Sequence, residues 1–206
     1  MTFDSITDKV SRYYTDRVRE HGTTARGVDW NSEESQILRF EQLARVLPDG
    51  ERYTLVDYGC GYGALIPFLE RRTRRFAYQG FDVAEEMVTR ARHDHPGGQR
   101  RFTSREADLE PADYALASGI FNVRLDTPAE DWTRYVMHTL ESLNRLGTRG
   151  FSFNMLTSYS DADRMRADLY YGDPCVYFDH CKRSFSRQVA LLHDYGLWEF
   201  TILVRK

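Results

Sequence analysis

Three glycines and two aspartates mark the part of the chain that is best able to do chemistry. In the stretch LVDYGCGYGAL the glycines are Gly59, Gly61 and Gly63, and Asp57 comes just before them. Glycine lacks a Cβ atom, so such a loop lets the backbone approach a ligand closely and permits positive φ angles. Asp82 ends the next apolar run, where a carboxylate can accept both hydroxyls of a ribose. These residue types and spacings predict a site for a ligand that contains a nucleoside.

The glycine spacing by itself fits two kinds of cofactor. Read as Gly59-x-Gly61-x-x-Ala64, the loop matches the fingerprint that seats a dinucleotide pyrophosphate on a helix N-terminus. Asp57 favours another cofactor, because its carboxylate would repel a pyrophosphate and attract a cationic amino-acid group. S-adenosylmethionine has an ammonium and a sulfonium group and no phosphate. An oxidoreductase that uses a nicotinamide cofactor stays as the alternative.

Short apolar runs alternate with helical patterns from residue 53 onward, and these elements must position the glycine loop. Strands are predicted at 53–58, 76–82, 100–104, 113–121 and 150–156, and helices at 64–72, 84–92 and 131–146. Such alternation is typical of βαβ units around a parallel sheet. Residues 189–206 hold two more β-rich runs joined through Gly196, which predicts an antiparallel hairpin.

Two helices are predicted before the first strand. Apolar residues recur at helical spacing over 3–18, and Asn31 with Glu34 predicts a capping box for the second helix. We expect residues 1–50 to form a helical lid, an appendage that the sheet does not need for its own core. Residues 51–206 would then be the cofactor-binding part of a single domain.

Composition argues against several other classes of protein. The net charge of −3 over 206 residues offers no basic face for nucleic acid. No run approaches the ~18 apolar residues of a membrane span. Cys60, Cys175 and Cys181 form neither a CxxC pair nor an even set, so neither a metal site nor a disulfide framework is expected. These features predict a cytoplasmic protein.

Taken together, the motifs resemble those of class I S-adenosylmethionine-dependent methyltransferases. LVDYGCGYG, FDVAEEMV and EADLEPADYALASG are similar to the motif series of that family, and the terminal hairpin resembles its reversed seventh strand. The resemblance runs from about residue 53 to the C-terminus. It implies an α/β fold with a Rossmann-like, doubly wound, mostly parallel seven-stranded sheet, and S-adenosylmethionine as cofactor.

The resemblance also implies roles for individual residues in a cofactor site. The glycine loop would wrap the methionine part, Asp82 would hold the ribose, and Asp108 would bind the adenine amino group. Cys60 is expected to pack there and not to act as a nucleophile. The residues implied to contact the cofactor are Asp57, Gly59, Cys60, Gly61, Asp82, Val83, Asp108, Leu109, Ser118 and Gly119.

The sequence indicates the methyl acceptor less clearly than the cofactor. Methyl transfer is an in-line displacement, so the protein mainly orients the acceptor and excludes water, and no universal catalytic residue is expected. The chain lacks the Asn/Asp-Pro-Pro-aromatic motif of amino-methylating nucleic-acid enzymes, which favours O- or N-methylation of a small molecule. Residues expected to meet this acceptor are Tyr14, Trp30, Phe121, Asn122, Arg124 and Asn154.

Charged and titratable residues add three further expectations. Arg124, Arg164 and Arg166 favour an acceptor that carries a carboxylate or a similar anion. His193 is a candidate general base, although turn chemistry also explains a histidine at this position. The polar loop at 22–30 is expected to become ordered when cofactor binds. A nucleoside-binding protein without turnover stays as a non-enzymatic alternative.

Overall fold

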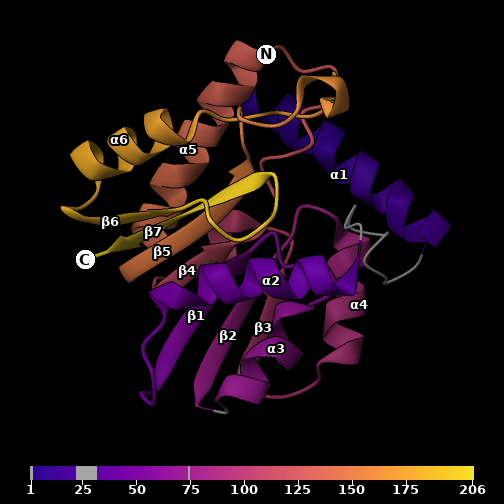
Figure 1. The fold of residues 1–206 in the computed structure, drawn as a ribbon. Coiled ribbons are helices and arrows are strands. Elements are labelled where there is room, and N and C mark those ends of the chain that lie inside the picture. The colour runs from indigo at the N-terminus through magenta and orange to yellow at the C-terminus, as the bar shows by residue number, and fades with distance from the viewer. Residues whose placement is uncertain (1, 22–31, 74) are drawn as a thin grey trace.

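A single seven-stranded sheet forms the centre of the molecule (Figure 1). The computed structural model describes residues 2–21, 32–73 and 75–206. The strands are β1 Tyr53–Tyr58, β2 Phe76–Phe81, β3 Arg100–Thr103, β4 Ala112–Ala117, β5 Gly147–Leu156, β6 Gln188–Leu192 and β7 Glu199–Arg205. Their order across the sheet is β3-β2-β1-β4-β5-β7-β6. β1 to β5 run parallel, whereas β7 is antiparallel to both β5 and β6, so the predicted mixed sheet with its hairpin is confirmed.

Helices cover both faces of this sheet. Figure 1 shows α2 and α3 on one face, with α5 and α6 on the other. The helices are α1 Phe3–His21, α2 Glu33–Leu43, α3 Leu65–Arg72, α4 Glu85–Asp94, α5 Ala129–Leu146 and α6 Pro174–Ser184. Short 3-10 turns occupy Ala44–Val46, Glu106–Asp108 and Ala162–Arg164. No helix among the described residues is long and apolar enough to cross a membrane.

Some boundaries differ from the sequence prediction. β4 ends at Ala117, short of the predicted 113–121, because Gly119 has a φ of +72° and turns the chain out of the strand. The start of α2 is capped by Ser32, whose side chain accepts a hydrogen bond from the Ser35 N–H at 3.2 Å. Asn31, the predicted cap, lies outside the described residues.

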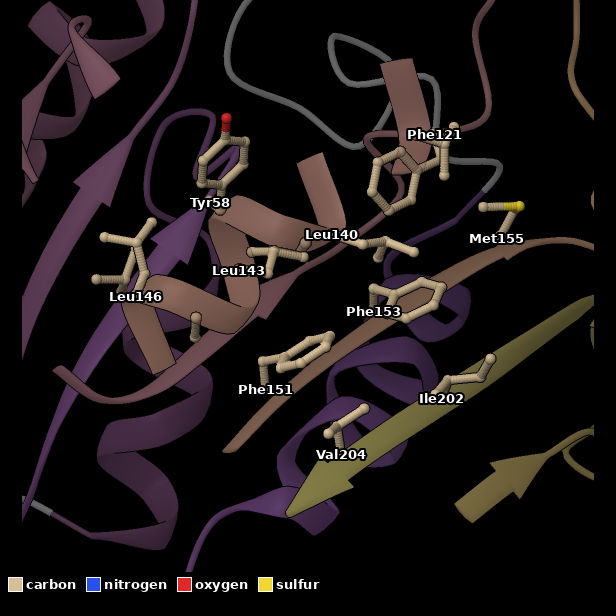
Figure 2. Packing of buried hydrophobic residues seen from close by; sticks show 14 of the residues in the cluster. Tyr58, Phe121, Leu140, Leu143, Leu146, Phe151, Phe153, Met155, Ile202 and Val204 are labelled. Carbon is tan, nitrogen blue, oxygen red and sulfur yellow. The ribbon is translucent and has the colours of Figure 1, made fainter. Parts of the chain in front are cut away.

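Amphipathic α5 builds the larger of the two cores. Trp132, Val136, Leu140 and Leu143 recur at helical spacing and are all fully buried. Figure 2 shows Leu140 and Leu143 of α5 on the side of Phe151 and Phe153 of β5, with Ile202 and Val204 of β7 alongside. Burying each such side chain stabilises the fold by about 1.5–3 kcal/mol relative to leaving it exposed.

The N-terminal helices belong to these cores, which differs from the expected appendage. Ile6 and Val10 of α1 pack into the core that α5 builds. Phe40 and Leu43 of α2 pack with α3 into the core on the opposite face. Each helix buries an apolar stripe that would otherwise face water, so α1 and α2 supply part of the packing on the sheet.

Candidate active site

A pocket that is partly open to solvent lies where β1, β2 and β4 end. In open α/β sheets ligands bind at this carboxyl edge, where the strand order reverses between β1 and β4. Helices α1, α2 and α5 also contribute side chains to its walls. The residues that line it are Val10, Tyr14, Gln36, Phe40, Asp57, Tyr58, Gly59, Cys60, Gly61, Tyr62, Ala64, Leu65, Phe81, Asp82, Val83, Met87, Ser118, Gly119, Ile120 and Tyr135.

The glycine loop after β1 requires the conformations that glycine allows. Gly59, Gly61 and Gly63 have φ angles of +84°, +54° and +87°. A Cβ atom on Gly59 would lie 2.2 Å from Cγ2 of Ile120, so the loop passes close to the turn after β4. The Gly59 and Cys60 N–H groups both donate to the Phe81 carbonyl, at 2.7 and 2.8 Å. These bonds hold the loop against the end of β2.

Asp82 ties the glycine loop to the start of α4. One carboxylate oxygen accepts the Gly61 N–H at 2.8 Å, and the other accepts the Ala84 N–H at 2.9 Å. Burial raises the pKa of Asp82, and the two backbone donors oppose that rise. Each oxygen keeps a second lone pair, so the carboxylate can still accept two hydroxyl groups from a ligand in the pocket.

Asp57 is a second buried carboxylate in the same pocket. Its side chain accepts a hydrogen bond from the Tyr78 hydroxyl at 2.6 Å, and the residue is 3% exposed. Burial raises its pKa to about 7; the Tyr78 bond lowers it, and the nearby charge of Asp82 adds to the rise. No lining residue in the described part of the chain is basic. A cationic ligand would therefore stabilise the ionised form of Asp57.

Cys60 packs beneath the loop as a neutral thiol. Burial raises its pKa well above the usual value, and the carboxylates of Asp57 and Asp82 add to the rise. Since the thiolate is the nucleophilic form, this environment disfavours covalent chemistry at Cys60.

Most of the residues expected to contact a cofactor line this pocket, whereas Asp108 and Leu109 do not. Asp108 is exposed in a 3-10 turn and accepts the Thr103 hydroxyl at 2.9 Å. The side chain of Leu109 is buried in the core on the α5 face. Contact between these two residues and an adenine ring stays a prediction.

The residues after β4 and on β5 that are expected to meet the acceptor make contacts within the protein, and their contact with an acceptor stays a prediction. Phe121 is fully buried in the core, and the Asn122 side chain accepts the Leu156 N–H at 3.1 Å. Arg124 donates to the carbonyls of Leu169 and Thr127, at 3.1 and 2.7 Å. The described lining of the pocket does not include these residues, nor Asn154, which is 0% exposed. The side chains of Asn122 and Arg124 bind backbone groups, whereas Asn154 binds both the Gly119 N–H and the Glu199 carboxylate.

The other acceptor candidates fall in separate places. Tyr14 lines the pocket from α1, and Trp30 and the loop 22–30 lie outside the described residues. His193 is exposed between β6 and β7, with its ring centroid 5.8 Å from that of Tyr159, and it does not line the pocket. Arg164 is exposed, and Arg166 pairs with Asp168 at 2.5 Å, also away from the pocket lining.

The sequence did not predict the residues of α2 and α5 that line the pocket. Gln36 and Phe40 are four residues apart on α2 and face the pocket together, and Tyr135 reaches it from α5. The spacing of Gln36 and Phe40 placed them on one helix face, but the pattern did not indicate that this face meets a ligand pocket.

Helix α1 closes the pocket beside Val83. The Ser11 hydroxyl donates to the Val83 carbonyl at 2.9 Å, and Thr15 donates to Glu86 at 3.1 Å. Arg19 pairs with the same Glu86 at 2.6 Å. These contacts hold Tyr14 over the carboxyl edge of the sheet, where it can shield a ligand from water.

The fold and this pocket together define a Rossmann-like protein that binds a nucleoside cofactor, and comparisons with known proteins identify its family. No family model matches the chain. Putative methyltransferase Rv1506c of Mycobacterium tuberculosis (strain ATCC 25618 / H37Rv) is 51% identical over 164 residues, which cover 79% of this chain and 98% of that protein. The chain therefore belongs to the class I S-adenosylmethionine-dependent methyltransferases.

Solved structures share the fold at low sequence identity. Magnesium protoporphyrin IX methyltransferase (ChlM) from Synechocystis PCC 6803, with bound SAM, has a TM-score of 0.63 and 18% identity, and the match covers 97% of each chain. Phosphoethanolamine N-methyltransferase 1 of Haemonchus contortus has a TM-score of 0.64 and 14% identity, and the match covers 100% of this chain and 50% of that one. Both share the overall fold of this chain.

Proposed function

We propose that this protein transfers the methyl group of S-adenosylmethionine to an oxygen or nitrogen atom of a small-molecule acceptor. The observation that carries the proposal is the pair of buried carboxylates, Asp57 and Asp82, on either side of the glycine loop. This arrangement suits a ligand with a cationic amino-acid end and a ribose. It does not suit a dinucleotide, since Asp57 would repel a pyrophosphate.

The lining residues fit the cofactor at several points. The free lone pairs of Asp82 suit two ribose hydroxyls, and Asp57 suits the ammonium group. The Ser118 Oγ is buried and has no hydrogen-bond partner among the described residues, so it is a candidate to bind the ligand directly. When bound, S-adenosylmethionine supplies an activated methyl group. The protein's own task is then to orient the acceptor and to exclude water.

The same lining supports a neutral or cationic acceptor. The arginines that favoured an anion are engaged with carbonyl groups or with Asp168, or are exposed away from the pocket. Aromatic rings of Tyr14, Tyr58 and Tyr135 face the pocket, and its described lining includes no basic group. An anionic acceptor would find no basic side chain in this described lining.

A methyl-transfer screen tests this proposal. Purified protein would be given S-adenosylmethionine labelled in the methyl group and a panel of neutral, cationic and anionic metabolites, with RNA as a separate arm. We expect label transfer to neutral or cationic acceptors. Transfer confined to anionic metabolites would contradict the charge argument, and transfer confined to RNA would contradict the small-molecule acceptor.

Removal of the Asp82 carboxylate tests the cofactor assignment. We expect Asp82→Ala to weaken binding of S-adenosylhomocysteine by about 1–3 kcal/mol, because buried hydroxyl groups lose a charged acceptor. Isothermal titration calorimetry measures this change. Denaturant unfolding shows how much stability the protein loses with the hydrogen bonds from Gly61 and Ala84 to Asp82. Asp113→Ala, at the opposite end of β4 and outside the pocket lining, is the matched control and should keep native affinity. Unchanged affinity in Asp82→Ala, or tighter binding of NAD by the native protein, would refute the assignment.

A further inference from the structure

A buried ion pair joins two elements that are far apart in the sequence. Arg39 of α2 donates from Nε to both oxygens of Glu199, at 2.9 and 2.8 Å, and from a terminal nitrogen at 2.5 Å. The two side chains are only 7% and 2% exposed. Removing two charges from water is costly, and an apolar pair of similar volume is often as stable. Stability alone is therefore a weak reason for this pair.

The hydrogen bonds continue from Glu199 to the wall of the pocket. The Asn154 Nδ2 group donates to Glu199 at 2.8 Å, and Asn154 Oδ1 accepts the Gly119 N–H at 2.7 Å. A carboxylate only accepts hydrogen bonds, so Glu199 determines which way the Asn154 amide points. In the reverse orientation, the amide NH2 would face the Gly119 N–H and the amide oxygen would face the carboxylate.

Both ends of this chain of contacts reach the cofactor pocket. Gly119 lines the pocket and has a φ of +72°, a conformation that its neighbours must hold in place. At the other end, Arg39 lies between Gln36 and Phe40 in the sequence of α2, and both of these residues line the pocket. The contacts thus connect the α2 wall to the turn after β4.

We infer that Arg39, Glu199 and Asn154 are positioning residues that hold Gly119 in its ligand-binding conformation. The inference rests on the proposed function, since it takes the pocket as the S-adenosylmethionine site. Glu199 acts by orienting the amide of Asn154, and Arg39 acts by holding the Glu199 carboxylate in place through three hydrogen bonds. All three act through Gly119 and are not themselves in the described lining of the pocket.

The test separates this role from a purely structural one. In the double variant Arg39→Met/Glu199→Met both charges are removed together, so no unpaired charge is buried. In Asn154→Ala the ion pair stays and only the amide is lost. Ser152→Ala is the matched control, because its buried hydroxyl also ties β5 to α2, at 3.0 Å from the Leu43 carbonyl, but does not reach Gly119.

Two measurements on each variant are needed: calorimetry with S-adenosylhomocysteine and hydrogen exchange of the Gly119 amide by NMR. We expect at least tenfold weaker binding and at least tenfold faster Gly119 exchange in the double variant and in Asn154→Ala, with neither change in Ser152→Ala. If either test variant is folded and keeps native affinity and native Gly119 exchange, the positioning role is overturned. A native protein that does not bind S-adenosylhomocysteine refutes the proposed function, and the Gly119 exchange still tests the contacts.

Discussion

Asp57→Asn is expected to weaken binding of S-adenosylhomocysteine while it stabilises the ligand-free protein at alkaline pH. Binding should fall at least 30-fold, or by about 2 kcal/mol, because the ammonium group of the ligand loses a buried carboxylate partner. At pH 8 the variant should gain on the order of 2–4 kcal/mol in free energy of unfolding. Calorimetry and urea unfolding, each at pH 5 and pH 8, measure the two effects.

The sign of the stability change follows from the pKa of Asp57, which burial raises from 3.8 to about 7. Between these values the folded protein keeps the carboxyl proton and the unfolded chain releases it, so the folded state binds more protons. The stabilisation is present at low pH and is lost as the pH rises towards 7. Above pH 7 the native protein holds a buried charge, which the asparagine variant avoids. At pH 5 the folded side chain is neutral, but Asp57 of the unfolded chain is already ionised, so the difference should shrink to about 1.7 kcal/mol and vanish only below about pH 4.

The pH dependence of ligand binding in the native protein is a second test of Asp57. Because the ligand needs the ionised carboxylate, affinity for S-adenosylhomocysteine should weaken by up to tenfold per unit as the pH falls below 7. This pH dependence should be absent in Asp57→Asn. Asp113→Asn, at the opposite end of β4, is the control and should keep native affinity. Native affinity in Asp57→Asn, or equal stabilisation at both pH values, would contradict the role given to Asp57.

Among alanine substitutions of the glycines in the loop, Gly59→Ala is expected to be the most damaging. The residue has a φ of +84°, and its Cβ would lie 2.2 Å from Ile120 Cγ2. The left-handed conformation costs about 1–2 kcal/mol for alanine, and the collision adds about 1–3 kcal/mol. We expect a loss of about 2–5 kcal/mol in stability. Binding of S-adenosylhomocysteine should be lost, because Ile120, which lines the pocket, must shift to make room.

Gly50→Ala separates the cost of the left-handed conformation from the cost of the collision with Ile120. Gly50 has a φ of +75°, and no atom lies within 4 Å of the position that its Cβ would occupy. This variant should lose only the conformational part, about 1–2 kcal/mol, and should bind ligand normally. Urea unfolding and calorimetry on both variants give the comparison. Equal destabilisation of the two would show that the approach of Ile120 is unimportant.

The parts of the site that local pattern describes were predictable from the sequence. The apolar run 53–58, the glycines after it and Asp82 at the end of the next run identified the loop and both buried carboxylates. Each strand brings its terminal residues to the same sheet edge, so these groups had to meet once the sheet was parallel. Phe121, Asn122 and Arg124 also follow a strand end, but they lie outside the described pocket lining, and their contact with an acceptor stays a prediction. Closeness to a strand end does not determine whether a side chain faces a ligand or binds the backbone of its own turn.

The sequence by itself determined the alternation of strands and helices and the residues at the end of each strand, because a period of 2 or 3.6 is a property of neighbouring positions. Only the tertiary structure decided that α2 contributes a wall of the pocket and that Arg39 meets Glu199 across 160 residues. It also decided that burial would raise the pKa of Asp57 to about 7. Desolvation and long-range pairing depend on which surfaces meet when the chain packs, and no local period records that.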